Sequence, residues 1–368
     1  MEGKMKILMT TDTIGGVWVY SLELCRALRK YDVEIHLAAM GTWPSQEQEQ
    51  EAAAIGNVIL YKSDYKLEWM DDPWADLKRA QKWLTSIYHT IHPDLVHFNN
   101  YAHAKKDWTC PTITVFHSCV QTWWQAVKGC SAPSSYDRYT QVVHQSLNDS
   151  DVVVGPTKGI LKRAQEVHQI DTQLQVIHNA RSQQYQTGRK ENIILCIGRI
   201  WDEGKNLKLL AAVAEQLPWP VYIAGSNINP DTGKPVKFNN IHFLGSLTPQ
   251  EVKNWMEKAK IFVSPTKYEP FGLAILEAAR AGCALVLSEL DTLKELWDGD
   301  AAFFDPFKAQ EGKQQILRVI EDATLQENLA NRAKNRAQQY STDKMGQAYY
   351  ELYQTNIKRK AELNLAEV

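Results

Sequence analysis

The sequence contains no long hydrophobic run and no strong excess of charge of either sign. Its 368 residues include 41 Lys and Arg against 43 Asp and Glu, which gives a net charge of -2. This balance excludes the strongly basic domain that usually marks nucleic-acid binding, so we expect no nucleic acid as a partner. No apolar run approaches the roughly 20 residues that a transmembrane helix needs. Lys4 and Lys6 precede an apolar run that ends too early for a signal peptide.

Several spacings that define common sites are also missing. Six cysteines are scattered, and no two of them have CxxC spacing, which argues against a zinc site and a disulfide framework. This usage suits a reducing compartment, and we expect a cytoplasmic protein. The acids and histidines lack metal-ligand spacing such as HExxH, so we expect no bound metal and no cofactor. The full GxGxxG pattern is absent as well, which argues against a dinucleotide-binding fold.

What the sequence does contain is an alternation of strand-like and helix-like segments, in two successive series. Strands are predicted at 6–12, 33–40, 57–62, 92–100, 111–118, 151–157 and 174–180, and then at 192–200, 220–225, 241–246, 261–266, 284–289 and 301–306. Helices are predicted at 17–31, 74–91, 136–147 and 207–217, from Thr248 and from Gln310 onward. Such alternation is typical of doubly wound parallel sheets, so the fold class is α/β.

The alternation is interrupted once, by a polar segment without periodicity at 183–191, which we interpret as a linker. We therefore predict an N-terminal domain at 1–184, a C-terminal domain at 185–341 and a final helical segment at 342–368. Two such halves would face each other across a cleft. In parallel sheets ligands bind beyond the carboxyl ends of the strands, which is where the candidate residues lie.

The segment from Ser264 to Cys283 holds two acids eight positions apart, Glu269 and Glu277. Pro270 and Gly272 are turn residues, so Glu269 is expected in a strand-to-helix loop and Glu277 more than one turn into the helix. The first amides of a helix have no partner within it and, with the helix dipole, form an anion site. This pattern suits a polyhydroxylated ligand carrying phosphate. The alternative is a capped helix with a solvated Glu.

Two cations, Arg199 and Lys205, lie at the end of a predicted strand and in the loop that follows it. A guanidinium and an ammonium at this spacing could clamp a diphosphate. The alternative is a solvated loop in which they pair with Asp202 and Glu203. We favour the phosphate interpretation because Arg199 follows the strand directly.

Further candidates follow strands of the first series. Gly15 and Gly16 would let the backbone approach a ligand closely, although a tight turn without a ligand explains them equally well. His117 ends the strand at 111–118, and an imidazole can donate, accept or carry a proton. The alternative is a structural histidine. Weaker candidates at another strand end are His97, Asn99 and Asn100.

These segments together resemble the retaining glycosyltransferases of family 4, which have the GT-B fold. EPFGLAILE is similar to the E-x7-E motif of that family. TVFHS resembles the strand that bears its donor-site histidine, and GRIWDEGKN the block with its diphosphate-binding Arg and Lys. Further matches are MTTDTIGGVWVYSLELCRAL, VIHNA, LGSLTPQEV and AGCALVLSE. The resemblance covers nearly the whole chain and implies a GT-B architecture of two Rossmann-like domains.

The resemblance implies roles in the second domain. Arg199 and Lys205 would neutralise the diphosphate leaving group without a metal. Glu269 would bond hydroxyls of the donor sugar, together with backbone amides from Phe271 to Leu273, and Glu277 would bind the ribose hydroxyls.

In the first domain, His117 would contact the donor sugar and Gly16 would leave room for the diphosphate. The last helix, within 342–368, would cross back to this domain. Family members transfer the sugar on its front face with retention, while the leaving phosphate oxygen takes the acceptor's proton. Stabilising the departing phosphate is then the main contribution of the protein.

Three segments depart from the family pattern. Ser118 stands where an acidic residue often follows the histidine, and Asn179-Ala180 stands where members often have Asn-Gly. Asp291-Thr292-Leu293 lacks the glycines of the family's turn, which puts donor contacts from that segment in question.

We therefore predict a metal-independent retaining glycosyltransferase, a hexosyltransferase, that uses a UDP-, GDP- or ADP-sugar. The acceptor, a saccharide, lipid or small molecule, is not identified, and its contacts are expected from loops at 15–16, 99–103 and 123–139. Two alternatives stay open: a nucleotide-sugar epimerase or hydrolase of the same fold, and a non-catalytic partner of another glycosyltransferase. Membrane association is expected to be weak at most, because Lys78, Arg79 and Lys82, or Lys105 and Lys106, are few.

Overall fold

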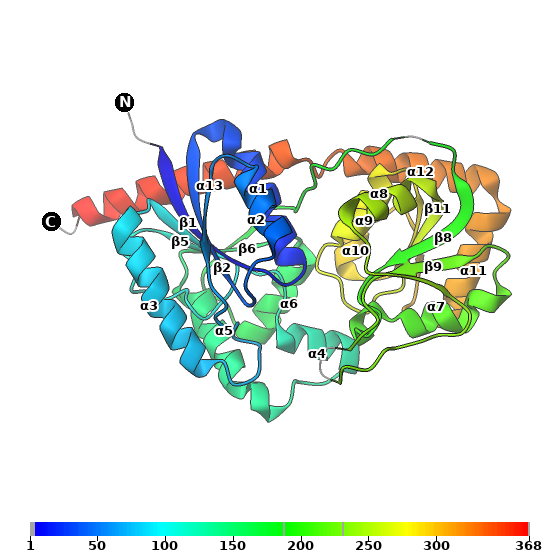
Figure 1. Ribbon diagram of the computed structural model, residues 1–368, viewed down its shortest axis with the longest axis horizontal. Coiled ribbons are helices and arrows are strands. Elements are labelled where there is room, and N and C mark those ends of the chain that lie inside the picture. The colour runs from blue at the N-terminus through cyan, green and yellow to red at the C-terminus, as the bar shows by residue number, and fades with distance from the viewer. Residues whose placement is uncertain (1–3, 187, 230–231, 367–368) are drawn as a thin grey trace. The chain divides into compact units, whose positions relative to one another are not determined.

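The structure is a computed structural model that describes residues 4–186, 188–229 and 232–366 (Figure 1). The chain divides into two compact units. The first unit comprises the described parts of Met1–Trp124, Ser131–Ala180 and Thr342–Val368, and the second those of Gln125–Cys130 and Arg181–Ser341. Residue 187, within the segment expected as a linker, lies outside the described residues, as do 1–3, 230–231 and 367–368.

The first unit contains a parallel sheet of seven strands in the order β3-β2-β1-β4-β5-β6-β7. The strands are β1 (Met5–Asp12), β2 (Val33–Met40), β3 (Val58–Lys62), β4 (Leu95–Phe98), β5 (Thr112–Val115), β6 (Val152–Gly155) and β7 (Gln173–Val176). The helices are α1 (Gly16–Leu28), α2 (Gln46–Ala53), α3 (Trp74–Ile91), α5 (Asp137–Asp149), α6 (Lys158–His168) and α13 (Thr342–Ala366). Helix α4 (Val120–Lys128) contributes residues to both units.

Helices cover both faces of this sheet, and its central strands contribute apolar side chains to the core on each face. Ile7 and Met9 of β1 pack in one cluster with residues of α1 and α13. Leu8, between them, packs on the opposite face with Leu84 of α3. Side chains of a strand alternate between faces, so the short apolar run of β1 contributes to two cores. Helix α13 thus forms part of the core of the first unit, although it follows the second unit in sequence.

The second unit contains a parallel sheet of six strands in the order β10-β9-β8-β11-β12-β13. The strands are β8 (Glu191–Ile197), β9 (Val221–Ala224), β10 (His242–Gly245), β11 (Ala259–Ser264), β12 (Ala284–Ser288) and β13 (Ala302–Phe304). The helices are α7 (Leu207–Val213), α8 (Pro249–Lys258), α9 (Leu273–Arg280), α10 (Asp291–Trp297), α11 (Ala309–Glu321) and α12 (Ala323–Ala337). Leu195 of β8 packs with α9 on one face, and Ile194 packs with α7 and α11 on the other.

The two series of strands were predicted correctly and form two parallel sheets in an α/β fold. The predicted start of α8 is confirmed: Thr248 and Glu251 form a reciprocal capping box with Pro249 in the first turn. One expectation was wrong. Trp123 and Trp124 lie in helix α4 rather than in a loop.

Within the described part of the chain, no helix is long and apolar enough to cross a membrane.

Candidate active site

The segment between β11 and α9 has the predicted form, with Glu269 in the loop and Glu277 in the second turn of α9. Gly272 caps the helix with φ 87°, in the left-handed region that favours glycine. A Cβ atom at this position would lie 2.7 Å from Cδ1 of Ile275. The tight turn that sends the chain from Glu269 into α9 therefore requires a glycine.

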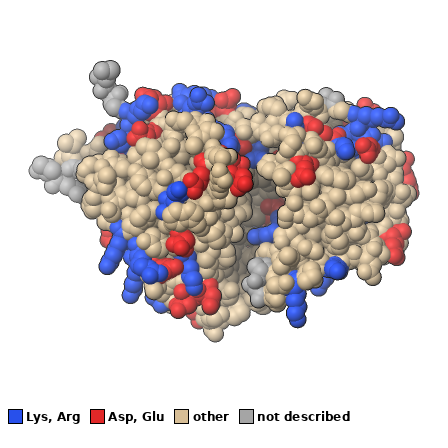
Figure 2. All heavy atoms as spheres, viewed as in Figure 1, with Lys and Arg blue, Asp and Glu red and all other residues tan. Residues whose placement is uncertain are grey.

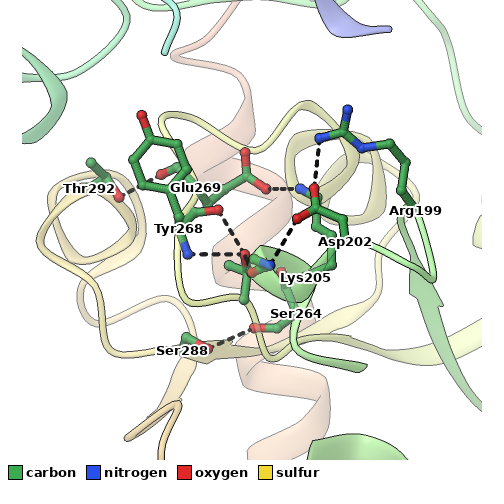
Figure 3. Close-up of polar contacts among 10 residues, drawn as sticks. Arg199, Asp202, Lys205, Ser264, Tyr268, Glu269, Ser288 and Thr292 are labelled. Atoms are coloured by element: carbon green, nitrogen blue, oxygen red, sulfur yellow. Dashed lines mark hydrogen bonds and ion pairs between the residues drawn. The ribbon is translucent and has the colours of Figure 1, made fainter. Parts of the chain in front are cut away.

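Glu269 forms an ion pair with Lys205, one of the two predicted phosphate-binding cations (Figure 3). Nζ of Lys205 lies 2.7 Å from Oε2 of Glu269, and the two side chains are 25% and 15% exposed. The backbone carbonyl of Glu269 accepts a 2.7 Å hydrogen bond from Oγ1 of Thr292 in α10. Thr292 belongs to the segment that departs from the family pattern, and here it fixes the main chain beside Glu269.

Arg199 lies in the loop after β8 and pairs with Asp202, whose carboxylate also shapes the loop (Figure 3). Oδ2 of Asp202 lies 2.7 Å from the Arg199 guanidinium, and Oδ1 accepts a 2.9 Å bond from the amide of Gly204. The pairing that the alternative interpretation proposed for Arg199 is therefore present. The Arg199 side chain is nevertheless 56% exposed, so it can reach a ligand in solution.

The loops that carry Lys205 and Glu269 are tied together through their backbones. The carbonyl of Gly204 accepts bonds from Oγ1 of Thr266, at 2.7 Å, and from the amide of Lys267, at 2.8 Å. Gly225, after β9, lies so close that an added Cβ would be 2.0 Å from the carbonyl oxygen of Gly198. This contact fixes the backbone immediately before Arg199. Backbone contacts thus hold the two cations and Glu269 where the loops after β8, β9 and β11 meet, a place that we call the loop junction.

Glu277 forms a separate, largely buried ion pair with Arg181, a residue that sequence reasoning missed. Nε of Arg181 donates to Oε1 of Glu277 at 2.5 Å. Arg280, one turn farther along α9, donates to the backbone carbonyl of Arg181. Arg181 lies 96 positions before Glu277, so only the fold reveals the pair. Its single sequence signal is a cation directly after the segment VIHNA.

The two neighbours of Gly272 contribute to the core as well as to the loop. Phe271 is buried against the cluster beneath α9, and Leu273 is partly buried against the same cluster. Their side chains therefore anchor the first turn of α9, while the backbone amides of this turn are oriented by the cap at Gly272.

In the first unit, Gly16 begins α1 and Gly15 precedes it with φ 87°. Asp12, at the end of β1, was not predicted and is the titratable group closest in sequence to this loop. Its Oδ1 accepts a 2.9 Å bond from the amide of Ile14. Burial raises the pKa of Asp12 to about 7, and the nearby charge of Glu68 acts in the same direction.

His117 follows β5 and has its protonation fixed by Asn99, one of the weaker candidates. Nδ2 of Asn99 donates to the carbonyl of Thr10 at 2.9 Å, which leaves Oδ1 as the acceptor for Nε2 of His117 at 2.8 Å. This pattern assigns the proton to Nε2 and makes Nδ1 an acceptor. Burial lowers the pKa of His117 to about 3, so the ring is neutral at pH 7.

The same asparagine connects His117 to helix α13. Nε2 of His97 lies 3.3 Å from Oδ1 of Asn99, and Nδ1 of His97 lies 2.7 Å from the hydroxyl of Tyr353. The Tyr20 ring contacts His117 edge-on at 4.6 Å between ring centroids. Burial lowers the pKa of His97 to about 3, so this network is neutral as well. Ser118 uses its backbone carbonyl to accept the hydroxyl of Tyr101 at 2.7 Å.

The structure thus brings Lys205 and Glu269 together and places Arg199 on the same junction, whereas Glu277 pairs separately with Arg181. Gly16 and His117 belong to the first unit. Among residues 4–186, 188–229 and 232–366, no group of three or more His, Cys, Asp or Glu side chains is placed to hold a metal ion.

Two family models match this chain. The model described as Glycosyltransferase Family 4 matches residues 14–182, and the model described as Glycosyl transferases group 1 matches residues 178–336. Together they span most of the sequence and meet where the first unit gives way to the second.

Curated relatives align over part of their length. N,N'-diacetylbacillosaminyl-diphospho-undecaprenol alpha-1,3-N-acetylgalactosaminyltransferase of Campylobacter jejuni is 28% identical over 177 residues, 46% of this chain and 46% of that protein. Phosphatidyl-myo-inositol mannosyltransferase of Mycolicibacterium smegmatis is 29% identical over 119 residues, 32% of this chain and 31% of that protein. The chain therefore aligns with less than half the length of these relatives.

Solved structures align over nearly the whole chain. Sucrose-phosphate synthase of Thermosynechococcus elongatus has a TM-score of 0.78 and 15% identity, covering 95% of this chain and 98% of that one. The Anabaena protein HepE in complex with UDP-glucose has a TM-score of 0.73 and 15% identity, covering 95% of this chain and 100% of that one. At such identity these likenesses establish the fold alone.

Proposed function

Because this chain belongs to the family 4-like glycosyltransferases of the GT-B fold, we propose that it transfers a sugar from a nucleotide-diphosphate donor to an acceptor hydroxyl. The observation that carries the proposal is the pair of Lys205 and Glu269, 2.7 Å apart at the carboxyl ends of β8 and β11, with Arg199 on the same loop junction. Ligands of open parallel sheets bind at this end of the strands.

The two cations supply the charge for the diphosphate. Arg199 offers a planar guanidinium that can bond two phosphate oxygens, and Lys205 offers an ammonium as a point charge. When the donor binds, Arg199 and Lys205 would give up part of their pairing with Asp202 and Glu269 and would pair with phosphate instead. On this proposal the cations neutralise the leaving group, and no metal ion is needed.

The acids bind hydroxyls rather than attack the sugar. Glu269 bonds hydroxyls of the donor sugar, together with the amides from Phe271 to Leu273, and Glu277 bonds the ribose while sharing its carboxylate with Arg181. His117 accepts a sugar hydroxyl through Nδ1, the atom that the Asn99 bond leaves without a proton. Gly16 leaves room for the diphosphate.

We further propose front-face transfer with retention of configuration. The bond from the sugar carbon to the phosphate oxygen breaks, and the bond from that carbon to the acceptor oxygen forms on the same face. The acceptor's proton passes to the departing phosphate oxygen. The catalytic contribution of the protein is then the stabilisation of negative charge on that phosphate, for which fixed cations in a preorganised loop are effective.

A UDP-sugar is the first donor to test, because HepE, which shares the fold, was solved with UDP-glucose. GDP- and ADP-sugars remain candidates. Two curated relatives are named for lipid-linked acceptors, a diphospho-undecaprenol and a phosphatidyl-inositol. We extend this to the chain as a proposal that lipid-linked acceptors belong in the screen, next to saccharides.

The test is to incubate the protein with UDP-, GDP- and ADP-sugars, with and without acceptors, and to identify the products and their anomeric configuration. We expect transfer with retention that Lys205→Ala removes. Lys294→Ala is the matched control, because Lys294 forms an equally short ion pair with Glu289 on the exposed surface of the same unit. Turnover of donor without an acceptor would point to the hydrolase or epimerase. If no donor binds, or Lys205→Ala transfers at the wild-type rate, the proposal fails.

A further inference from the structure

A cavity of about 510 Å³ lies in the first unit, between α3, α5 and the segment that follows β4. Its volume is within the range of small-molecule sites. Buried apolar surface forms part of its lining, contributed by Leu77, Tyr101 and Ala104. Within the described residues, none of the groups assigned above to the donor or to proton transfer lines it.

Four cations line the same cavity, and none of its lining residues is an Asp or Glu. They are Lys78 and Lys82 of α3, Lys105 of the segment after β4, and Arg138 of α5. In the sequence they are dispersed over three segments, where Lys78, Lys82 and Lys105 were too few to predict more than weak membrane association. In the described part of the chain, none of the four forms an ion pair with a carboxylate.

Their sequence neighbours behave differently. Arg79 pairs with Asp76, and Lys106 lies 3.8 Å from Asp149. Arg79 and Lys106, which do not line the cavity, thus have acidic partners, whereas the four cations that line it have none among the described residues. Exposed cations brought together repel one another, and an anion between them removes that cost.

One of the four is also held by an aromatic ring. The guanidinium carbon of Arg138 lies 3.8 Å from the centroid of the Trp74 ring, at the start of α3. This stacking joins α5 to α3 at the cavity and places the cation over the face of the indole. Indoles combine an apolar body with a polar N–H and are enriched at the level of lipid headgroups.

From these observations we propose that the cavity binds an anionic phospholipid of a bilayer. The phosphate lies among Lys78, Lys82, Lys105 and Arg138, and the start of the hydrocarbon chain lies on the apolar lining. A small phosphate ion would use the cations but not the apolar surface, so both features together select an amphiphile. Figure 2 shows Lys and Arg side chains gathered at the lower left, over the region where Figure 1 places α3. The proposal concerns binding alone and stands whether or not the donor assignment holds.

The first experiment measures co-sedimentation of the full chain with vesicles of phosphatidylcholine, with and without phosphatidylglycerol. We expect binding only to the anionic vesicles. Each cation at a membrane surface contributes roughly a fivefold change in affinity, so Lys78→Ala with Lys105→Ala should weaken binding about 25-fold. Arg79→Ala with Lys106→Ala removes two charges from the same two segments and should leave most of the binding. Equal losses in both double variants would indicate general surface attraction and overturn the proposal.

A second variant tests the cavity without changing charge. Val142 lines it from α5 and is partly exposed, so Val142→Trp should fill the space and weaken vesicle binding while the melting temperature stays close to that of the wild type. Wild-type binding by this folded variant would overturn the proposal. Binding of soluble glycerol phosphate as tight as binding to the anionic vesicles would also overturn it, since the apolar lining would then contribute nothing. If Val142→Trp does not fold, the two charge variants decide the question.

Discussion

The side chains at the carboxyl ends of the strands differ in charge between the two units. In the second unit the groups are charged and partly exposed, with Lys205 paired to Glu269 and Arg199 held by Asp202. In the first unit they are neutral and largely enclosed: His97 and His117 share Asn99 as an acceptor, and burial lowers the pKa of both rings to about 3. The ends of β8 and β11 therefore carry charged groups, whereas the ends of β4 and β5 carry a neutral network.

The difference matches the two tasks proposed for the site. An ion pair can exchange its partner, so Lys205 and Arg199 can turn to a phosphate when one arrives. A neutral network cannot offset the charge of a diphosphate, but it fixes which atoms donate and which accept. Nδ1 of His117 can therefore only accept a hydrogen bond, which suits a ligand hydroxyl that donates one.

The largest effect is expected in the charged unit. Glu269→Gln removes the carboxylate that we propose bonds the sugar, together with the anionic partner of Lys205, so kcat/KM for transfer should fall about a hundred- to a thousandfold, as for other groups that act on the transition state. Steady-state kinetics measure this. Glu289→Gln is the control, because Glu289 makes an ion pair of the same length with Lys294 on the surface. A Glu269→Gln enzyme as fast as the control would refute the role of Glu269.

A smaller effect is expected in the neutral unit. Asn99→Leu removes the acceptor that orients His117, so kcat should fall roughly tenfold or more, as expected for the loss of a positioned polar group. Asn99→Asp restores an acceptor but adds a charge beside the ring, which raises the pKa of His117. We expect its kcat to depend on pH near neutrality, where the wild type shows no dependence from this ring. Identical pH profiles for the two enzymes would contradict the network.

The free energy of unfolding should also depend on pH, because the first unit buries titratable groups. Burial lowers the pKa of His103 from 6.5 to about 3, so below pH 6.5 the unfolded chain takes up a proton that the folded chain does not. Stability is then lost as pH falls from 6.5 toward 3, by about 1.4 kcal/mol per pH unit for this group. His103→Gln should reduce that slope accordingly in urea unfolding.

Asp12 provides the internal control for that experiment, because its sign is opposite. Burial raises its pKa from 3.8 to about 7, so its contribution to stability falls as pH rises between these values. Asp12→Asn should therefore increase the loss of stability per unit fall in pH, whereas His103→Gln should decrease it. Slopes that move in the same direction in both variants would show that these groups are not buried as described.

The smallest effect concerns salt. Donor affinity should weaken a few-fold as ionic strength rises from about 0.05 M to about 0.5 M, since the Debye length shortens over this range. Titration calorimetry measures it. The kcat ratio of Asn99→Leu to wild type should be unchanged by salt, because that network carries no charge. A salt-independent donor affinity would remove the case for phosphate pairing with Lys205 and Arg199.

Much of the fold could be predicted from local patterns. The capping box at Thr248, the glycine turn at Gly272 and the apolar strands each rest on residues close in sequence. Helix α2 was missed because QEQEQEAA has no apolar periodicity, although Ser45 and Gln48 form a capping box that signals its start. Helix α4 was missed because its two tryptophans were read as part of a loop.

Pairings across the chain could not be predicted. Arg181 and Glu277 are 96 positions apart, and His97 and Tyr353 are 256 apart, so nothing in the local sequence indicates either contact. The raised pKa of Asp12 has the same origin, because it depends on burial that only the packed sheet creates. The residue types alone indicated Lys205, Glu269 and His117 as candidates, whereas their partners and protonation states could be assigned only from the fold.

The most direct test is to compare donor affinity and turnover in Lys205→Ala and Asn99→Leu, using calorimetry for Kd and product formation for kcat. We expect Lys205→Ala to weaken donor binding, raising Kd by roughly a factor of ten or more, because a charge-assisted contact to phosphate is lost. We expect Asn99→Leu to leave Kd nearly unchanged and to lower kcat. An unchanged Kd in Lys205→Ala, or a loss of donor affinity confined to Asn99→Leu, would contradict the division between a charged and a neutral unit.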